Sequence, residues 1–183
     1  MILNSRFRKA VRLQVWAAAL ILMLAYGFVP VAAEELPREA VLPLAMATKA
    51  AATAQEKCKQ DGYRVSVAVV DRAGTLKVLM RGDGAGPHSI DSSAKKAYTA
   101  ASLRKPTSEY VDTLTKNPAV QGLRDVNDRI LILGGGLPID IGGEIVGGIG
   151  VGGAPGGHLD EACAQAGLDS IGAASKAPAP GGK

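Results

Sequence analysis

Aromatic residues are scarce in this chain of 183 residues, at 4% of the total. Beyond residue 33 the only aromatic side chains are three tyrosines, Tyr63, Tyr98 and Tyr110. Proteins that bind single-stranded nucleic acid stack the bases on aromatic side chains, so this scarcity argues against a nucleic-acid partner. It also means that the hydrophobic core must be built from Val, Ile, Leu and Ala.

The motifs of several enzyme classes are also missing. The chain has two cysteines, Cys58 and Cys163, without the C-x-x-C spacing of a zinc site or a redox dithiol. Its two histidines, His88 and His158, belong to no His/Asp/Glu cluster with metal-ligand spacing. The serines near residue 90 have no G-x-S-x-G setting, and the glycines at 134–136 lack the Lys-Ser/Thr of a P-loop. The residues therefore indicate a binding protein more than an enzyme.

Acidic residues are absent from residues 1–33, which predict a secretory signal peptide. Basic residues precede an uncharged apolar run over residues 13–29, and Val31 and Ala33 suit the −3 and −1 positions of a cleavage site. An uncleaved membrane anchor is the alternative, but the run is shorter than the span of about 20 residues that a bilayer requires. We expect cleavage after Ala33 and a periplasmic or secreted location.

Removing this leader also removes the net charge. The chain carries 21 basic and 17 acidic residues, and four of the basic ones lie in the leader. The remaining charges balance, so the mature chain has no general attraction for nucleic acid or anionic membranes. Its length predicts one domain over residues 34–174, followed by a disordered tail rich in Pro, Gly and Ala at 175–183.

Hydrophobic periodicity predicts four helices and five strands. The helices are expected at residues 37–60, 89–103, 109–114 and 158–170, and the strands at residues 65–70, 75–81, 129–133, 137–141 and 144–151. Hairpins dominate this order, so the fold class is α+β, with a five-stranded, mostly antiparallel sheet flanked by helices. Pro138 places the fourth strand at an edge, because proline cannot donate to a ladder. The glycines of the last strand imply close packing of a helix or a subunit against it.

Helical spacing predicts which side chains face inward. On the first helix the inward stripe comprises Val41, Leu44, Thr48, Ala51, Gln55 and Cys58. Cys163 lies on the corresponding stripe of the last helix, so a disulfide is feasible if the two helices pack side by side. Two buried, unpaired thiols are the alternative. Lys95 and Lys96 of the second helix are expected on a solvated face.

The segment from Arg64 to Gly86 predicts a β-hairpin that runs into a glycine-rich loop. Gly74 supplies the positive φ that the hairpin turn requires. The loop from Arg81 to Pro87 contains three glycines, so its backbone can turn sharply or approach another group closely. It is either a flexible exit from the sheet, one wall of a pocket, or a seam between subunits.

Six blocks in order along the chain resemble the GlcG/HbpS-type haem-binding family. They lie at residues 65–74, 81–86, 95–100, 106–108, 134–139 and 148–161, and include the sequences VSVAVVDRAG, RGDGAG, KKAYTA, PTS, GGGLPI and GIGV. The resemblance covers roughly residues 42–171, nearly the whole mature domain. The C-terminal domain of the PduO corrinoid enzymes is a relative of this family.

The resemblance implies both an assembly and a ligand. It implies profilin-like layers, homo-oligomers from dimers to octamers, and binding of haem, or of a corrinoid in the PduO branch. For extracellular members it implies a carrier, or a redox- or haem-sensing accessory subunit beside a membrane sensor kinase. The alternatives are a haem-degrading or corrinoid-handling enzyme or enzyme accessory, and a generic small-molecule-binding module.

The resemblance and the chemistry of haem together nominate site residues. Thr107 of the Pro-Thr-Ser block corresponds to a threonine that lines the haem pocket of the family. Some relatives use a histidine near the start of the domain, but residues 34–64 contain none. His88 is therefore the first candidate for the axial, metal-binding ligand, and Tyr98 is the second. The candidate cations for the haem propionates are Arg81, Arg104 and Lys105.

Overall fold

The computed structural model of the chain describes residues 35–175. The signal peptide predicted at 1–33 and the last eight residues of the predicted tail lie outside this range. The described residues from Glu39 onward form one compact unit. Within the described range, none of the helices is long and apolar enough to cross a lipid bilayer.

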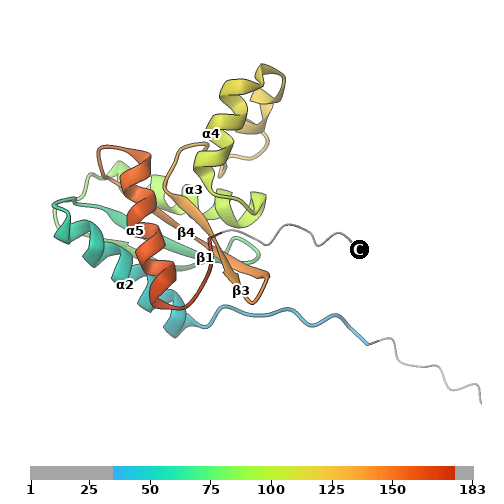
Figure 1. Cartoon of the computed structure of the whole chain (residues 1–183), viewed down its shortest axis with the longest axis horizontal. Helices are drawn as coiled ribbons and strands as arrows, with labels where there is room; N and C mark the ends of the chain where they lie inside the picture. The colour runs from blue at the N-terminus through green and yellow to red at the C-terminus, as the bar shows by residue number, and fades with distance from the viewer. Residues whose placement is uncertain (1–34, 176–183) are drawn as a thin grey trace, which may run out of the picture. The chain divides into compact units, whose positions relative to one another are not determined.

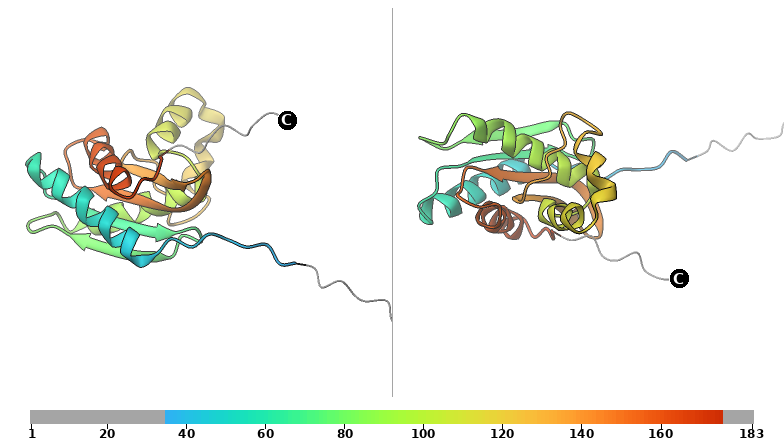
Figure 2. Two further views of the ribbon diagram at one scale, coloured as in Figure 1. Left: turned by 60° about the horizontal axis from the view of Figure 1, so that its bottom comes forward. Right: turned by 90° about the horizontal axis from the view of Figure 1, so that it is seen from above.

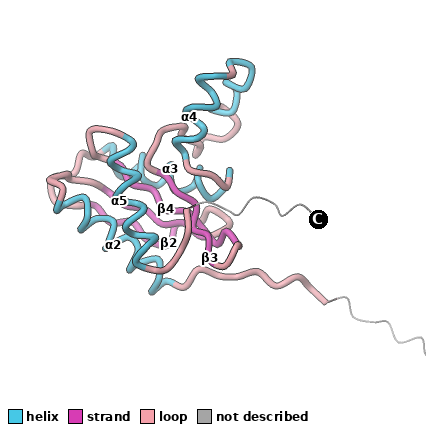
Figure 3. Tube along the Cα trace, viewed as in Figure 1, coloured by secondary structure: helices cyan, strands magenta, loops and turns pink. Residues whose placement is uncertain are grey.

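Two antiparallel hairpins form the sheet (Figures 1 and 3). The first joins β1 (Ser66–Asp71) to β2 (Leu76–Arg81), and the second joins β3 (Gly136–Ile141) to β4 (Glu144–Gly152). The hairpins meet where β1 pairs with β4, which makes the strand order β2-β1-β4-β3. Gly74, Gly142 and Gly143 have positive φ in the two turns, and the hairpin prediction required it at Gly74. β3 is an edge strand, which confirms the prediction from Pro138.

Helices cover both faces of the sheet in three layers (Figure 2, right). α2 (Leu44–Gln60) and α5 (Gly157–Ser170) pack side by side on one face, and α3 (His88–Leu103) covers the other. α4 (Thr107–Lys116) and the 3-10 helix η1 (Pro118–Arg124) follow α3 and stand apart from these layers. The predicted α+β class is therefore confirmed.

Successive side chains of β1 point to opposite faces of the sheet, which determines the residues on each face. Val67 and Val69 join the large core under α2 and α5, whereas Ala68 and Val70 face α3. The α3 face of β4 is lined with glycine, and a Cβ at Gly150 would lie 2.2 Å from the carbonyl oxygen of Ser93. The predicted close approach of a helix to these glycines is thus confirmed. α3 rests directly on the backbone of β4.

The prediction of a fifth strand at residues 129–133 is wrong, because this segment has no ladder and the described sheet has four strands. Ile130 and Ile132 instead pack on Leu114 of α4 in a small separate cluster. The backbone N–H of Leu131 donates to Oγ1 of Thr99 on α3, at 2.8 Å. The hydrophobic run therefore fastens α4 to α3 rather than extending the sheet.

The first helix begins later than predicted, at Leu44, because the backbone of Pro43 is extended. Three members of the predicted inward stripe are exposed: Val41 and Leu44, at 75% and 59% of their surface, and Thr48. The buried stripe comprises Ala47, Ala50, Ala51, Ala54 and Cys58. This stripe of small side chains lets α2 pack closely on α5.

Cys58 of α2 and Cys163 of α5 form a disulfide, the pairing that the two helical stripes made feasible. Both cysteines are fully buried. The bond joins residues 105 positions apart in the sequence. It fastens the first and last helices of the domain on the same face of the sheet.

Candidate functional site

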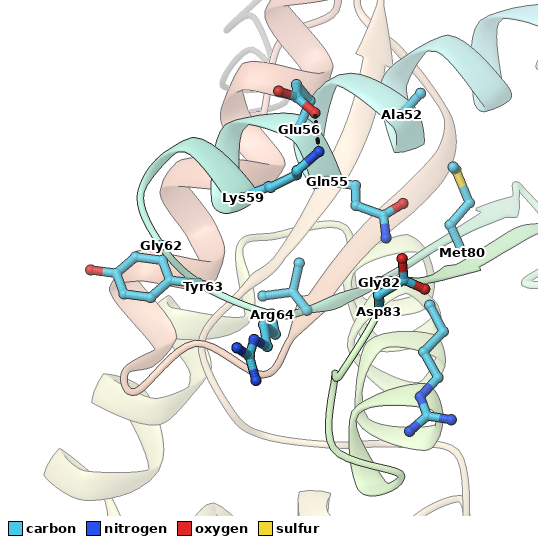
Figure 4. Close-up of a pocket in the computed structure, with 12 residues that line it drawn as sticks. Ala52, Gln55, Glu56, Lys59, Gly62, Tyr63, Arg64, Met80, Gly82 and Asp83 are labelled. Atoms are coloured by element: carbon cyan, nitrogen blue, oxygen red, sulfur yellow. Dashed lines mark ion pairs between the residues drawn. The ribbon is translucent and has the colours of Figure 1, made fainter.

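A cleft of about 610 Å³ lies between α2 and the end of β2 (Figure 4). Its walls come from one face of α2, from the link into β1, and from the start of the glycine-rich loop. The lining residues are Ala52, Gln55, Glu56, Lys59, Gly62, Tyr63, Arg64, Val65, Met80, Arg81, Gly82 and Asp83. The volume falls within the range of about 300–1,000 Å³ that is usual for small-molecule sites.

The glycine-rich loop is one wall of this cleft, one of the roles predicted from its sequence. The N–H of Gly82 donates to the carbonyl of Val65 at 2.9 Å, which ties the start of the loop to β1. Nη2 and Nε of Arg81 donate to the carbonyl oxygen of Ala85 at 2.6 and 3.1 Å. Gly84 has φ +74°, and the side chain of Arg64 lies against it. The loop is therefore held by its own hydrogen bonds rather than being a free exit.

The charge of the cleft is mixed, with three cations and two carboxylates. Lys59 is 3.9 Å from Glu56 on the same helix, an exposed pair of small net value. Arg81 uses its guanidinium on the loop. Arg64 forms no ion pair with any described residue, and Figure 4 shows its side chain directed away from α2 toward the loop. Arg64 therefore has the guanidinium most available to an anionic ligand.

His88 lies at the far end of the same loop, as the exposed first residue of α3. A Cβ on Gly86 would lie 2.6 Å from Cε1 of His88, so the imidazole folds back over the loop. Of the six predicted site residues, only Arg81 lines the cleft, and His88 follows its loop wall directly.

The other four predicted site residues lie farther along α3 and beyond it. Tyr98 stacks under Arg129, with 3.7 Å between the guanidinium carbon and the ring centroid, beside a separate cavity of about 220 Å³. Arg104 and Lys105 are exposed in the link to α4. Since α3 is 16 residues long, His88 and this link are about 24 Å apart along the helix. One chain therefore does not bring the six residues into a single pocket.

Thr107 is fully buried at the start of α4. Its Oγ1 accepts a hydrogen bond from the N–H of Gly136, at 2.9 Å, at the start of β3. A Cβ on Gly136 would lie 2.7 Å from Cγ2 of Thr107. Within this chain Thr107 thus joins α4 to the sheet.

A buried ion pair of Lys96 and Asp160 lies beneath the glycines at 134–136, and sequence reasoning missed it. Lys96 Nζ donates to Asp160 Oδ2 at 2.7 Å and to the carbonyl of Val151 at 2.9 Å, with both side chains almost fully buried. The expectation that Lys96 is solvated is wrong. Its spacing of three from Ser93 and four from Ala100, both buried, was the available signal. The adjacent Lys95, by contrast, is exposed.

The environment of Asp160 sets its protonation. Burial raises the pKa of Asp160, and the hydrogen bond and positive charge of Lys96, together with the N–H of Ala154, act in the opposite direction. A Cβ on Gly135 would lie 2.6 Å from Cβ of Asp160 and 3.0 Å from Nζ of Lys96. The ion pair therefore requires glycine at position 135.

Among the described residues, no three His, Cys, Asp or Glu side chains form a group that could hold a metal ion. The described part of one chain therefore has no metal site of three or more such ligands. The arrangement of the cleft suits binding of an organic ligand that carries negative charge. An α+β domain of three layers with a cation-bearing cleft beside a glycine-rich loop is the class that these observations define.

Comparison with known proteins identifies the family. Residues 42–169 match the family model described as "Haem degrading protein HbpS-like". The chain is 32% identical to Protein GlcG of Escherichia coli over 111 residues, which cover 61% of this chain and 81% of GlcG. The chain belongs to the HbpS-like family.

Solved structures agree with this assignment. A double mutant of HbpS from Streptomyces reticuli is 48% identical, with a TM-score of 0.69, over 78% of this chain and 97% of that one. A structure described as a PduOC:heme complex is 27% identical, with a TM-score of 0.69, over 75% of this chain and 99% of that one.

Proposed function

We propose that this chain is an exported haem-binding protein that acts as a carrier or as a haem- or redox-sensing accessory subunit, without turnover. The observation that carries the proposal is the cation-bearing cleft beside His88, in a chain that shares its fold with a solved haem complex. The proposed location in the periplasm or outside the cell, and partners such as a membrane sensor kinase and further copies of the chain, rest on the predicted signal peptide and on the family resemblance.

The residues of the cleft and its loop fit haem on three counts. Haem needs apolar contacts, an axial donor and cations for its two propionates. Ala52, Val65 and Met80 supply apolar surface. Lys59 and Arg64 supply positive charge at the rim.

The axial donor assigned to the site is the imidazole of His88, which is exposed and immediately follows the loop. Arg81 is assigned as a positioning residue, because its guanidinium holds the loop through Ala85. Haem bound here would supply a redox-active iron. Thr107, Tyr98, Arg104 and Lys105 lie outside the cleft, so in this proposal they contribute to haem binding only where an assembly of several copies brings them to it.

Titration of the purified protein with haemin tests the proposal. We expect a Soret band that saturates at one haem per chain, with the affinity reduced at least about tenfold in His88→Ala, since axial ligation is lost. Arg64→Ala is expected to weaken haem more than haem dimethyl ester, which carries no propionate charge. His158→Ala is the matched control for histidine content and should bind as the unmodified chain does. A chain with no Soret band at micromolar protein overturns the proposal.

Haem degradation is the second candidate, and the description of the matching family favours it. The same haemin complex, incubated with a reductant and oxygen, distinguishes the two functions. A stable Soret band supports a carrier or sensor. Decay of the band with release of iron, faster than for free haemin, supports degradation. A corrinoid is the remaining ligand candidate, from the likeness to PduO, and is tested by titration with cobalamin.

A further inference from the structure

A further cavity, of about 370 Å³, lies where the N-terminal half of α5 faces the start of α4. It is lined by Ser108, His158, Glu161, Ala162 and Gln165. It contains the other histidine of the chain, and no residue of it lines the α2–β2 cleft. None of its lining residues belongs to the proposed haem site.

The carboxylate of Glu161 is the unexplained group of this cavity. Its Oε2 atom is buried and has no hydrogen-bond partner among residues 35–175. A buried, unpaired polar atom in a folded protein calls for a water or an ion that satisfies it. Its neighbour Asp160 is fully engaged by Lys96 and Ala154, so it cannot serve Glu161.

The spacing of His158 and Glu161 suits chelation. Residues three apart on a helix are neighbours on its surface, with about 5–6 Å between their Cβ atoms. A histidine and a glutamate at this spacing supply an imidazole nitrogen and a carboxylate oxygen to one ion, the ligand types that transition metals accept. Ser108 on α4 and Gln165 one turn farther along α5 add a hydroxyl and an amide oxygen to the same cavity.

We propose that His158 and Glu161 bind a divalent transition-metal ion in the cavity between α5 and α4. Two protein ligands, completed by water and by the hydroxyl of Ser108, make an open and exchangeable site rather than a permanent structural one. Bound metal bridges α5 to the start of α4, the helix that otherwise stands apart from the three layers. The site accepts or releases metal without rearranging the buried Lys96–Asp160 pair.

A second histidine–carboxylate pair with the same spacing provides a control for this site. His88 and Asp91 have the same spacing at the start of α3, but they do not share a cavity, since Asp91 faces the cavity beside Tyr98. Asp91→Asn therefore removes an equal charge from an equivalent helical position without touching the proposed site. The two histidines also provide two imidazole signals that can be followed separately by NMR.

Titration of the untagged chain with Zn²⁺ at neutral pH, by calorimetry and by proton NMR of the imidazoles, tests the proposal. We expect one site per chain, with a shift of the His158 signal that saturates before that of His88. His158→Ala and Glu161→Gln should each weaken Zn²⁺ binding at least about tenfold, since loss of a residue that only hydrogen-bonds to a metal ligand already costs about that much. Asp91→Asn should leave the affinity unchanged.

Three outcomes overturn the proposal. They are equal affinity in Glu161→Gln and the unmodified chain, a larger loss in Asp91→Asn than in Glu161→Gln, and parallel shifts of both imidazole signals. Circular dichroism of each variant at the titration temperature separates a lost ligand from a lost fold. A haemin titration of His158→Ala keeps this result independent of the haem proposal.

Discussion

At the residue scale, the ion pair of Lys96 and Asp160 holds α3 and α5 together beside the segment that leads into β3. Lys96 reaches from α3 to the carbonyl of Val151 in β4 and to Asp160 on α5, and Asp160 accepts the N–H of Ala154. Gly135 lies against both side chains with φ +112°. The charges are matched and almost completely removed from water, so removal of either partner leaves the other buried and unpaired.

Replacement of Lys96 by Met is therefore expected to cost about 3–5 kcal/mol in the free energy of unfolding. The double variant Lys96→Met with Asp160→Leu should recover much of this loss, because it leaves no charge behind. Urea unfolding followed by circular dichroism measures both values. A Lys96→Met variant as stable as the unmodified chain would contradict this account of the pair.

The same variant has a predicted pH dependence. Without Lys96, only the N–H of Ala154 opposes the effect of burial, so the folded pKa of Asp160 rises further above the unfolded value of about 3.9. The folded state then binds more protons than the unfolded state, so the stability of Lys96→Met should fall as pH rises from about 4 through the folded pKa. In the double variant, which lacks both groups, this slope should disappear.

At the element scale, the packing of α2 on α5 depends on small side chains and on one covalent bond. The alanine stripe of α2 buries little surface per residue, so close packing has to be held by other means. The Cys58–Cys163 bond serves this purpose and closes a loop of about a hundred residues. An oxidising compartment is where such a bond persists, which accords with the proposed export.

The double variant Cys58→Ala with Cys163→Ala is expected to lose about 4–5 kcal/mol in the free energy of unfolding, the value of the chain-entropy model for a loop of this length. Unfolding of the unmodified chain with and without dithiothreitol supplies the comparison. The double variant itself should show no further loss on addition of the reductant. If complete reduction of the disulfide leaves the unfolding midpoint of the unmodified chain unchanged, the disulfide does not stabilise the fold.

The two hairpins and the segment 129–133 show which elements the sequence could predict. The two hairpins and their turns were predictable, because alternation and glycine placement are local signals. The segment 129–133 carries the same apolar signal as a strand, but it has no strand partner, and the N–H of Leu131 donates to Thr99 on α3 instead. An apolar segment of this kind can form a strand or can pack against a helix. Here its packing against α4 decides the outcome.

At the scale of the whole molecule, cleavage of the predicted leader would leave a chain whose charges balance, with no general attraction for nucleic acid or anionic membranes. The four basic residues of the leader account for the whole formal charge of +4. The cleft and the cavity at α5 share no lining residue. The proposed organic ligand and the proposed metal ion are therefore expected to bind independently.

We predict that the exported protein begins at Glu34. Expression of the full gene in a bacterial host, followed by osmotic release and mass spectrometry of the protein's N-terminus, measures this directly. Ala33→Lys should block cleavage and retain the longer form in the membrane fraction, since small residues are required at this position. An unprocessed chain in the cytoplasm would rule out the proposed location.

The sequence by itself determined the α+β class, the hairpins, the helical positions of both cysteines, and the family, because all of these follow from local periodicity or from ordered blocks of residues. It did not determine the number of strands, the burial of Lys96, or which predicted site residues lie together. Those depend on which segments meet across the sheet. His88 and Thr107 are separated by the length of α3, and Lys96 finds its partner 64 positions away. Contacts of that kind have no local signature, so only the tertiary structure decided them.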